Sequence, residues 1–153
     1  MAVSKQYDSV LGAKLLLALA YEKGIVLNVT KVQKMLYIIY SYFMAKHNIQ
    51  LFIERPKAWP YGPVFPKTRK RVNYGIVYKR DQTELKDLLS EAELVAKFTS
   101  VITIYSKFSA SELSDWSHMC GSPWDRTTKI PGFKWGDRIP DAFIKEYFSN
   151  LEI

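Results

Sequence analysis

Apolar residues recur every three or four positions over two stretches near the start of the chain. The first stretch ends near Gly24, and its apolar positions are Val10, Leu11, Leu15 and Leu19 with neighbouring alanines. The second covers residues 29–46, with apolar positions Val32, Leu36, Ile39, Tyr40, Phe43 and Met44. This spacing is that of one face of an α-helix. Since Asp8 or Ser9 can cap the first stretch and Asn28 the second, the pattern predicts two helices, the first of them buried.

Later helix starts are marked by capping residues that an acidic residue follows after three positions. The pairs with this capping-box spacing are Asp81/Glu84, Ser90/Glu93 and Ser109/Glu112. We expect a long helix after Ser90 and a shorter one after Ser109. Ser122 and Pro123 fit the cap and first position of one or two further helical turns, and Pro140 or Asp141 starts a last amphipathic helix.

Prolines interrupt the middle of the chain, where four of the seven fall within residues 56–66. We expect loop there, with a small hairpin or ribbon from Leu51–Ile53 and Lys57–Trp59, another extended piece at Ile76–Tyr78, and a short helix from Pro66 that carries the TRKR run. The predicted fold is therefore mainly α: one compact domain over residues 1–153, a bundle of about six to seven helices with a small β-hairpin or extended pieces near residues 51–60 and 76–79.

Positive charge is concentrated in the same region. The formal net charge is +7, and the segment from Arg55 to Arg80 holds eight basic residues and no acidic one, so the rest of the chain is nearly balanced. Trp59, Tyr61, Tyr74 and Tyr78 lie among these basic residues. A local positive field attracts phosphates, anionic lipid or an acidic protein, and charge alone does not choose among them.

Cysteine and hydropathy indicate the compartment. Cys120 is the only cysteine, which excludes an intramolecular disulfide and favours a reducing environment. The apolar run Leu15–Ala20 is too short to cross a bilayer and lacks the features of a secretory signal. We therefore expect a cytoplasmic protein with no membrane partner.

Residues that could carry chemistry are few. His47 and His118 lie at the ends of different predicted helices, and one cysteine with two histidines does not make a zinc site at the usual ligand spacing. Paired carboxylates fall at helix starts or in a loop, where they cap or are solvated. We therefore predict no catalytic residue, no metal and no cofactor.

Four motifs occur in one order along the chain. They are K-x-Q-K-x-L-Y (Lys31, Gln33, Lys34, Leu36, Tyr37), A-W-x-Y-G-P-V followed by Pro66 (Ala58, Trp59, Tyr61, Gly62, Pro63, Val64), L-S with a downstream His and P-W (Leu113, Ser114, His118, Pro123, Trp124), and a last helix that ends in EYF (Glu146, Tyr147, Phe148). Together they resemble the Panacea domain, whose family includes phage-associated proteins and the SocA-like antitoxins, over roughly residues 10–148.

The resemblance implies a mainly helical domain that acts as an antitoxin, binding and neutralising a toxin protein encoded beside it, and it implies no enzyme activity. The expected partner is thus a cognate toxin, which the domain blocks or delivers to a protease. Two alternatives stay open: a phage-derived inhibitor or regulator of a host defence system, and a nucleic-acid-binding regulator. The oligomeric state is not predicted.

Two groups of residues are candidates for these roles. For structure we select Gln33, Trp59, Gly62, Pro63 and Trp124: the Gln33 amide and the Lys34 ammonium would satisfy carbonyls of the 59–63 loop, and Trp59 and Tyr61 would pin that loop by aromatic burial. For partner contact we select Lys67, Arg69, Lys70 and Arg71, with Tyr61 and Lys34. If the basic run binds nucleic acid, affinity should fall steeply with salt, whereas a protein interface should survive moderate salt.

Overall fold

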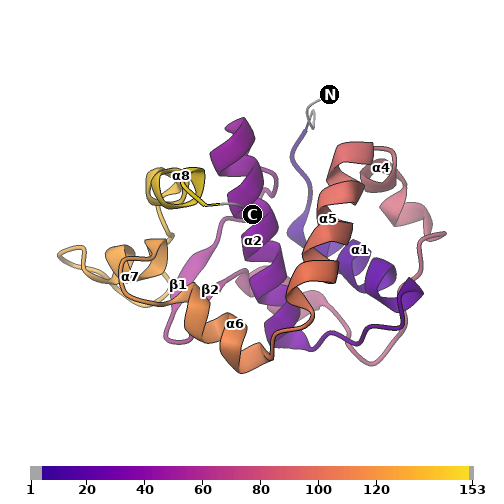
Figure 1. Ribbon diagram of the computed structural model, residues 1–153, viewed down its shortest axis with the longest axis horizontal. Helices are drawn as coiled ribbons and strands as arrows, with labels where there is room; N and C mark the ends of the chain where they lie inside the picture. The colour runs from indigo at the N-terminus through magenta and orange to yellow at the C-terminus, as the bar shows by residue number, and fades with distance from the viewer. Residues whose placement is uncertain (1–4, 152–153) are drawn as a thin grey trace.

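Helix α2 (Val29–His47) runs through the centre of the computed structural model, which describes residues 5–151. Helices α1 and α5 pack on one side of it, and α6, α8 and the strand β2 pack on the other (Figure 1). The remaining helices are shorter and lie outside these contacts. The described residues form eight α-helices, one 3-10 helix and one two-stranded sheet: α1 Ser9–Glu22, α2 Val29–His47, β1 Lys57–Trp59, β2 Gly62–Val64, α3 Pro66–Arg71, η1 Thr83–Leu85, α4 Lys86–Leu89, α5 Ala92–Tyr105, α6 Ala110–Ser117, α7 Pro123–Thr128 and α8 Asp141–Ser149.

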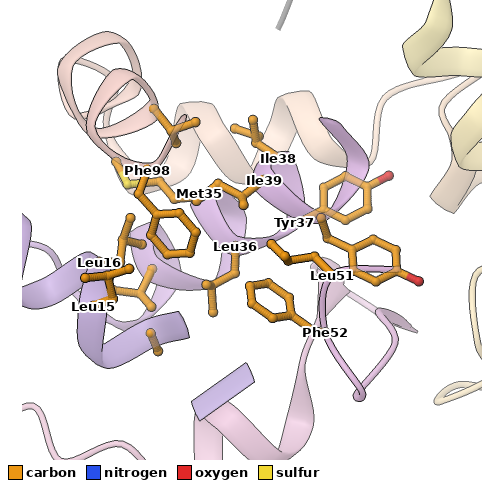
Figure 2. Packing of buried hydrophobic residues seen from close by; sticks show 14 of the residues in the cluster. Leu15, Leu16, Met35, Leu36, Tyr37, Ile38, Ile39, Leu51, Phe52 and Phe98 are labelled. Atoms are coloured by element: carbon orange, nitrogen blue, oxygen red, sulfur yellow. The ribbon is translucent and has the colours of Figure 1, made fainter. Parts of the chain in front are cut away.

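The core surrounds α2, in which every residue from Val32 to Ser41 is buried. Figure 2 shows Leu15 and Leu16 of α1 and Phe98 of α5 gathered at one side of α2, and Leu51 and Phe52 at the other. A helix covered on both sides needs apolar residues around most of its circumference, which explains its long apolar run. Each large side chain buried in this way contributes roughly 1.5–3 kcal/mol to folding. The mainly helical fold predicted from the sequence is confirmed.

Most predicted helix starts agree with the structure. The Asp8 side chain accepts a hydrogen bond from the Val10 amide, and that of Asn28 accepts one from the Lys31 amide. Ser109 forms the complete capping box with Glu112, and Ser122 caps α7. The short helix from Pro66 is also present as α3.

Two of the predicted capping boxes are wrong. Ser90 is the C-cap residue directly after α4, and its hydroxyl donates to the carbonyl of Asp87, so it is not available to cap α5. Glu91 precedes α5 without a side-chain cap. Before η1, the Gln82 side chain accepts a hydrogen bond from the Lys79 amide, and Asp81 makes no cap.

The hairpin also has a different partner from the one predicted. Strand β1 pairs antiparallel with β2, with Trp59 opposite Gly62. Gly62 has a φ of 115°, a conformation that glycine adopts without steric cost, and this lets two residues connect the strands. Phe52 instead makes an isolated parallel bridge with Tyr7, and residues 76–78 form no strand.

Within residues 5–151, no helix combines the length and the apolar character that crossing a bilayer requires.

A pocket beside the hairpin as the candidate binding site

A hollow in the surface lies where the start of α2, the β1–β2 turn and α6 meet. Its volume is about 590 Å³, and Arg69 of α3 contributes to its wall. Lys34 and Tyr61, selected from the sequence for partner contact, line it together with Trp59 and Gly62, which were selected for a structural role. The fold thus brings together residues from five elements, α2, β1, β2, α3 and α6, at one concave surface.

Lys34 lies in the wall of this pocket, with only 4% of its surface exposed. Its ammonium donates hydrogen bonds to the carbonyl oxygens of Pro63 at 2.9 Å and Tyr61 at 3.2 Å. No carboxylate lies within 4 Å of this ammonium among the described residues. Burial disfavours the charged form and lowers the pKa of Lys34 to about 8.

Gln33 binds the backbone of Phe65, the residue directly after β2. Its side-chain oxygen accepts a hydrogen bond from the Phe65 amide at 2.7 Å, and its side-chain nitrogen donates to the Phe65 carbonyl at 3.3 Å. Lys34 therefore bonds to the predicted loop, whereas Gln33 bonds just beyond it. Both side chains supply partners to a backbone that has only three residue pairs in its sheet.

Two further side chains, from α6 and α7, also hold the hairpin by hydrogen bonds. The indole nitrogen of Trp124 donates to the carbonyl of Trp59 at 2.7 Å, and the hydroxyl of Ser114 donates to the carbonyl of Tyr61 at 2.9 Å. Residues 136–138 pair with β1 through Ala58, which donates to Asp137 and accepts from Gly136. The turn is thereby anchored to α2, α6 and α7 together.

Gly62 lies directly on this network. A Cβ atom at this position would stand 2.6 Å from Ser117 Oγ and 2.9 Å from Lys34 Nζ. Both distances are too short for real contacts, and the positive φ adds strain for any other residue. A larger residue at this position would push the Ser117 hydroxyl and the Lys34 ammonium away from their hydrogen-bond acceptors.

Tyr61 and Trp59 differ in burial. Trp59 is half-buried, with the guanidinium of Arg69 5.7 Å from its ring centre. Tyr61 is 79% exposed, so the prediction that aromatic burial pins it is wrong. Tyr61 follows Pro60 at the tip of a two-residue turn, where its backbone carbonyl, rather than its ring, is held by Lys34 and Ser114.

His118, Ser114 and Asp115 also line the pocket, and the sequence did not select them as site residues. The His118 ring packs on Trp124, with ring centres 5.3 Å apart, and its Nδ1 atom is buried without a hydrogen-bond partner. Ser114 and His118 belong to the third motif quoted above, so that motif could have identified them as site residues. Their closeness to the hairpin, however, depends on how α6 packs and cannot be read from the motif.

The basic run lies on α3, beside the pocket. The Lys67 amide donates to the Glu54 carboxylate at 2.6 Å, so a side chain from outside α3 caps the start of this helix. The Thr68 hydroxyl donates to Ser9 and Glu54. The Lys67 ammonium pairs with Asp8 at 3.1 Å. Lys70 and Arg71 are exposed, and within residues 5–151 neither has a carboxylate at ion-pair distance. That this run contacts a partner stays a prediction.

No group of three or more histidine, cysteine, aspartate and glutamate side chains with metal-binding geometry occurs in the described part of the chain. Cys120 is exposed and free. The residues that line the pocket offer hydrogen-bond donors, positive charge and aromatic surface.

Comparison with known proteins gives one family. The model of the SocA-like antitoxins with a Panacea domain matches residues 32–125, which contain most of the central helix α2, the hairpin and α6. The chain is also similar to Antitoxin SocA of Caulobacter vibrioides (strain NA1000 / CB15N), with 30% identity over 149 residues, covering 89% of this chain and 79% of that protein. No solved structure matches. The hairpin, α6 and most of the pocket lining fall inside the matched region, and this chain belongs to the family of SocA-like antitoxins with a Panacea domain.

Proposed function

We propose that this protein is the antitoxin of a toxin–antitoxin pair and neutralises its toxin by binding it directly. The family description and the name of the Caulobacter relative support the antitoxin role. In this proposal the toxin is a protein encoded beside the antitoxin. The complex is stoichiometric, and the antitoxin performs no chemistry of its own.

The observation that carries the proposal is the exposed Tyr61 ring at the mouth of the pocket, on a turn that is rigidly held. Aromatic side chains and arginines supply most of the binding energy in protein interfaces, and here Tyr61 stands beside Arg69 and Trp59. Lys34, Ser114 and Trp124 bind residues 59–63, and Gln33 binds Phe65 at the end of the hairpin, so little conformational entropy is lost when a partner docks. The mouth of the pocket thus has the composition and the rigidity of an interface centre.

The family match ends before α8 and begins inside α2, but we infer that residues 1–153 act as one Panacea-like domain. Helices α1 and α8 both pack against α2, and Tyr40 of α2 donates a hydrogen bond to Asp141 at the start of α8. Removing either helix would expose the buried surface of α2. The partner therefore meets one folded unit.

The test is growth rescue by co-expression. The neighbouring gene, expressed alone, should arrest growth, and co-expression of this protein should restore it. A variant with Tyr61→Ala and Arg69→Ala should rescue poorly although it accumulates to the same level, while Lys145→Ala on α8, an exposed residue outside the pocket, should rescue fully. Absence of any toxic neighbour, or full rescue by the double variant, would contradict the proposal.

The exposed Lys70 and Arg71 favour a second candidate, a nucleic-acid-binding regulator. Phosphate contacts release counterions, so such binding would weaken steeply as salt rises. The variant with Lys70→Glu and Arg71→Glu separates the two functions: it should abolish nucleic-acid retention if that is the function, and should leave growth rescue largely intact if Tyr61 and Arg69 form the interface.

A further inference from the structure

The pocket contains a buried positive charge that no carboxylate of the described residues compensates. Lys34 has three N–H donors, and the carbonyls of Tyr61 and Pro63 use two of them. Carbonyl dipoles solvate an ammonium only in part, and a buried charge is ordinarily paired with an opposite one. At the pocket wall, one N–H donor of Lys34 therefore has no acceptor and its positive charge has no carboxylate partner among the described residues.

Other groups around the pocket add to the positive potential. The first two residues of α2, Val29 and Thr30, line the pocket, as do the first two of α6, Ala110 and Ser111. A helix start carries a partial positive charge. Arg69 adds a full charge, and Asp115 is the one carboxylate in the lining. The sum favours an anion.

From this arrangement we propose that the pocket binds a carboxylate on a peptide segment of the partner protein, with Lys34 as its ion-pair partner and Tyr61 and Trp59 packing on the neighbouring residues. The inference rests on the proposed function, since it names the chemistry of the toxin segment that is recognised. The occupant is an aspartate or glutamate side chain, or a chain terminus.

Size and charge distinguish this occupant from nucleic acid. A hollow of about 590 Å³ accommodates a few side chains and hides Lys34 below its rim, whereas a nucleic-acid backbone follows exposed charge along a surface. The carboxylate of Asp115 would repel a row of phosphates but tolerates one anion placed at Lys34. A single inserted carboxylate thus fits better than a polyanion.

The test uses short random peptides displayed on phage and selected on the full-length protein, so it does not depend on knowing the toxin. Selected peptides should share an acidic residue or a free C-terminal carboxylate. A synthetic peptide of that sequence should bind at least tenfold more weakly when its acid is replaced by the matching amide. The same comparison on Lys34→Met should show no difference between acid and amide, which is a readout that a partial loss of folded protein cannot imitate.

Two further variants complete the design. Ser111→Trp places a large ring at an exposed position of the pocket wall and leaves Lys34 unchanged, so it should abolish peptide binding. Lys145→Met removes one charge outside the pocket and should bind like the wild type. Binding should also weaken from pH 7 to pH 9, as Lys34, with its pKa lowered by burial to about 8, loses its proton.

The proposal is overturned if no peptide is selected, if the acid and amide peptides bind the wild type equally, or if Lys34→Met still discriminates between them. It is also overturned if oligothymidine binds the wild type and Ser111→Trp abolishes that binding. Growth rescue without carboxylate-selective peptides would sink this inference and leave the antitoxin proposal standing. If carboxylate-selective peptides are found but no neighbouring gene is toxic, the antitoxin proposal fails and the pocket still binds carboxylates.

Discussion

The ammonium of Lys34 lies 2.9 Å from the carbonyl oxygen of Pro63, a residue 29 positions further along the chain. This hydrogen bond ties the central helix to a turn that has little regular structure of its own. It also places a charged group in a nearly closed environment. The same contact therefore stabilises the hairpin and gives the pocket its charge.

The first prediction concerns pH and the Lys34 ammonium. Its pKa is lowered in the folded protein to about 8, whereas in the unfolded chain it is near 10.4. Between these values the unfolded chain binds more protons, so the free energy of unfolding rises with pH. Relative to Lys34→Met, the wild type should gain on the order of 2 kcal/mol between pH 8 and pH 10 in urea unfolding.

The comparison with Lys34→Met is needed because buried tyrosines act in the opposite direction. Burial raises the pKa of Tyr37, and it raises the pKa of Tyr74 to about 12, so above pH 10 the unfolded chain loses protons that the folded protein keeps, and stability falls. Both proteins share these tyrosines. Parallel pH profiles for wild type and Lys34→Met would show that Lys34 is not buried as a charge.

The second prediction is that Gly62→Ala strongly destabilises the protein. The added methyl group would collide with Ser117 and Lys34, and alanine at this positive φ is strained. Steric strain and overpacking together should cost about 2–5 kcal/mol, measured by thermal or urea unfolding. Gly132→Ala is the matched control, because Gly132 also has a positive φ but nothing within 4 Å of the new Cβ. Equal losses at both positions would mean that packing at Gly62 is unimportant.

The third prediction isolates one hydrogen bond to the hairpin. Trp124→Phe removes the donor to the Trp59 carbonyl while keeping an aromatic ring, and should lower stability by about 1–3 kcal/mol. Trp135→Phe serves as the control, because Trp135 stacks on Trp124 but is 57% exposed. Unfolding curves of the two variants should separate clearly. If they coincide, the Trp124 bond does not hold the turn.

The fourth prediction tests what positions α3. Glu54→Ala leaves the Lys67 amide and the Ser9 hydroxyl without their acceptor and removes the more distant of the two acceptors of Thr68, so it should cost about 2–4 kcal/mol. The exposed Glu146, which pairs with Arg126 on the surface, is a control whose change to alanine should cost less than about 1 kcal/mol. Amide hydrogen exchange should show α3 opening first in Glu54→Ala; unchanged protection there would refute the role of Glu54.

The sequence predicted those parts of the structure that depend on local periodicity and capping. Helix α2 and the box at Ser109 follow from spacing alone, because neighbouring turns bring these residues together. The pairing of β1 with β2 did not, because Leu51–Ile53 has a higher β propensity than Gly62–Val64, and only the tertiary packing decides which segment β1 meets.

The candidate site was predicted in part. Lys34 and Gly62 were selected from motifs, and their contact is seen only in the folded chain. The exposure of Tyr61 was missed, because an aromatic ring beside Gly-Pro usually packs inward, and here the turn tip points it outward. His118 and Asp115 join the pocket through the packing of α6 against β2, a long-range contact that spacing along the chain does not encode.

The central claim is that this protein binds a toxin directly through the face that carries the pocket. Affinity purification of tagged wild type and tagged Ser111→Trp from the native host, washed at moderate salt, tests it most directly. The account predicts one stoichiometric protein on the wild type, toxic when expressed alone, and its loss from Ser111→Trp. Nuclease-sensitive nucleic acid without a bound protein, or equal retention of the toxin by both baits, would contradict it.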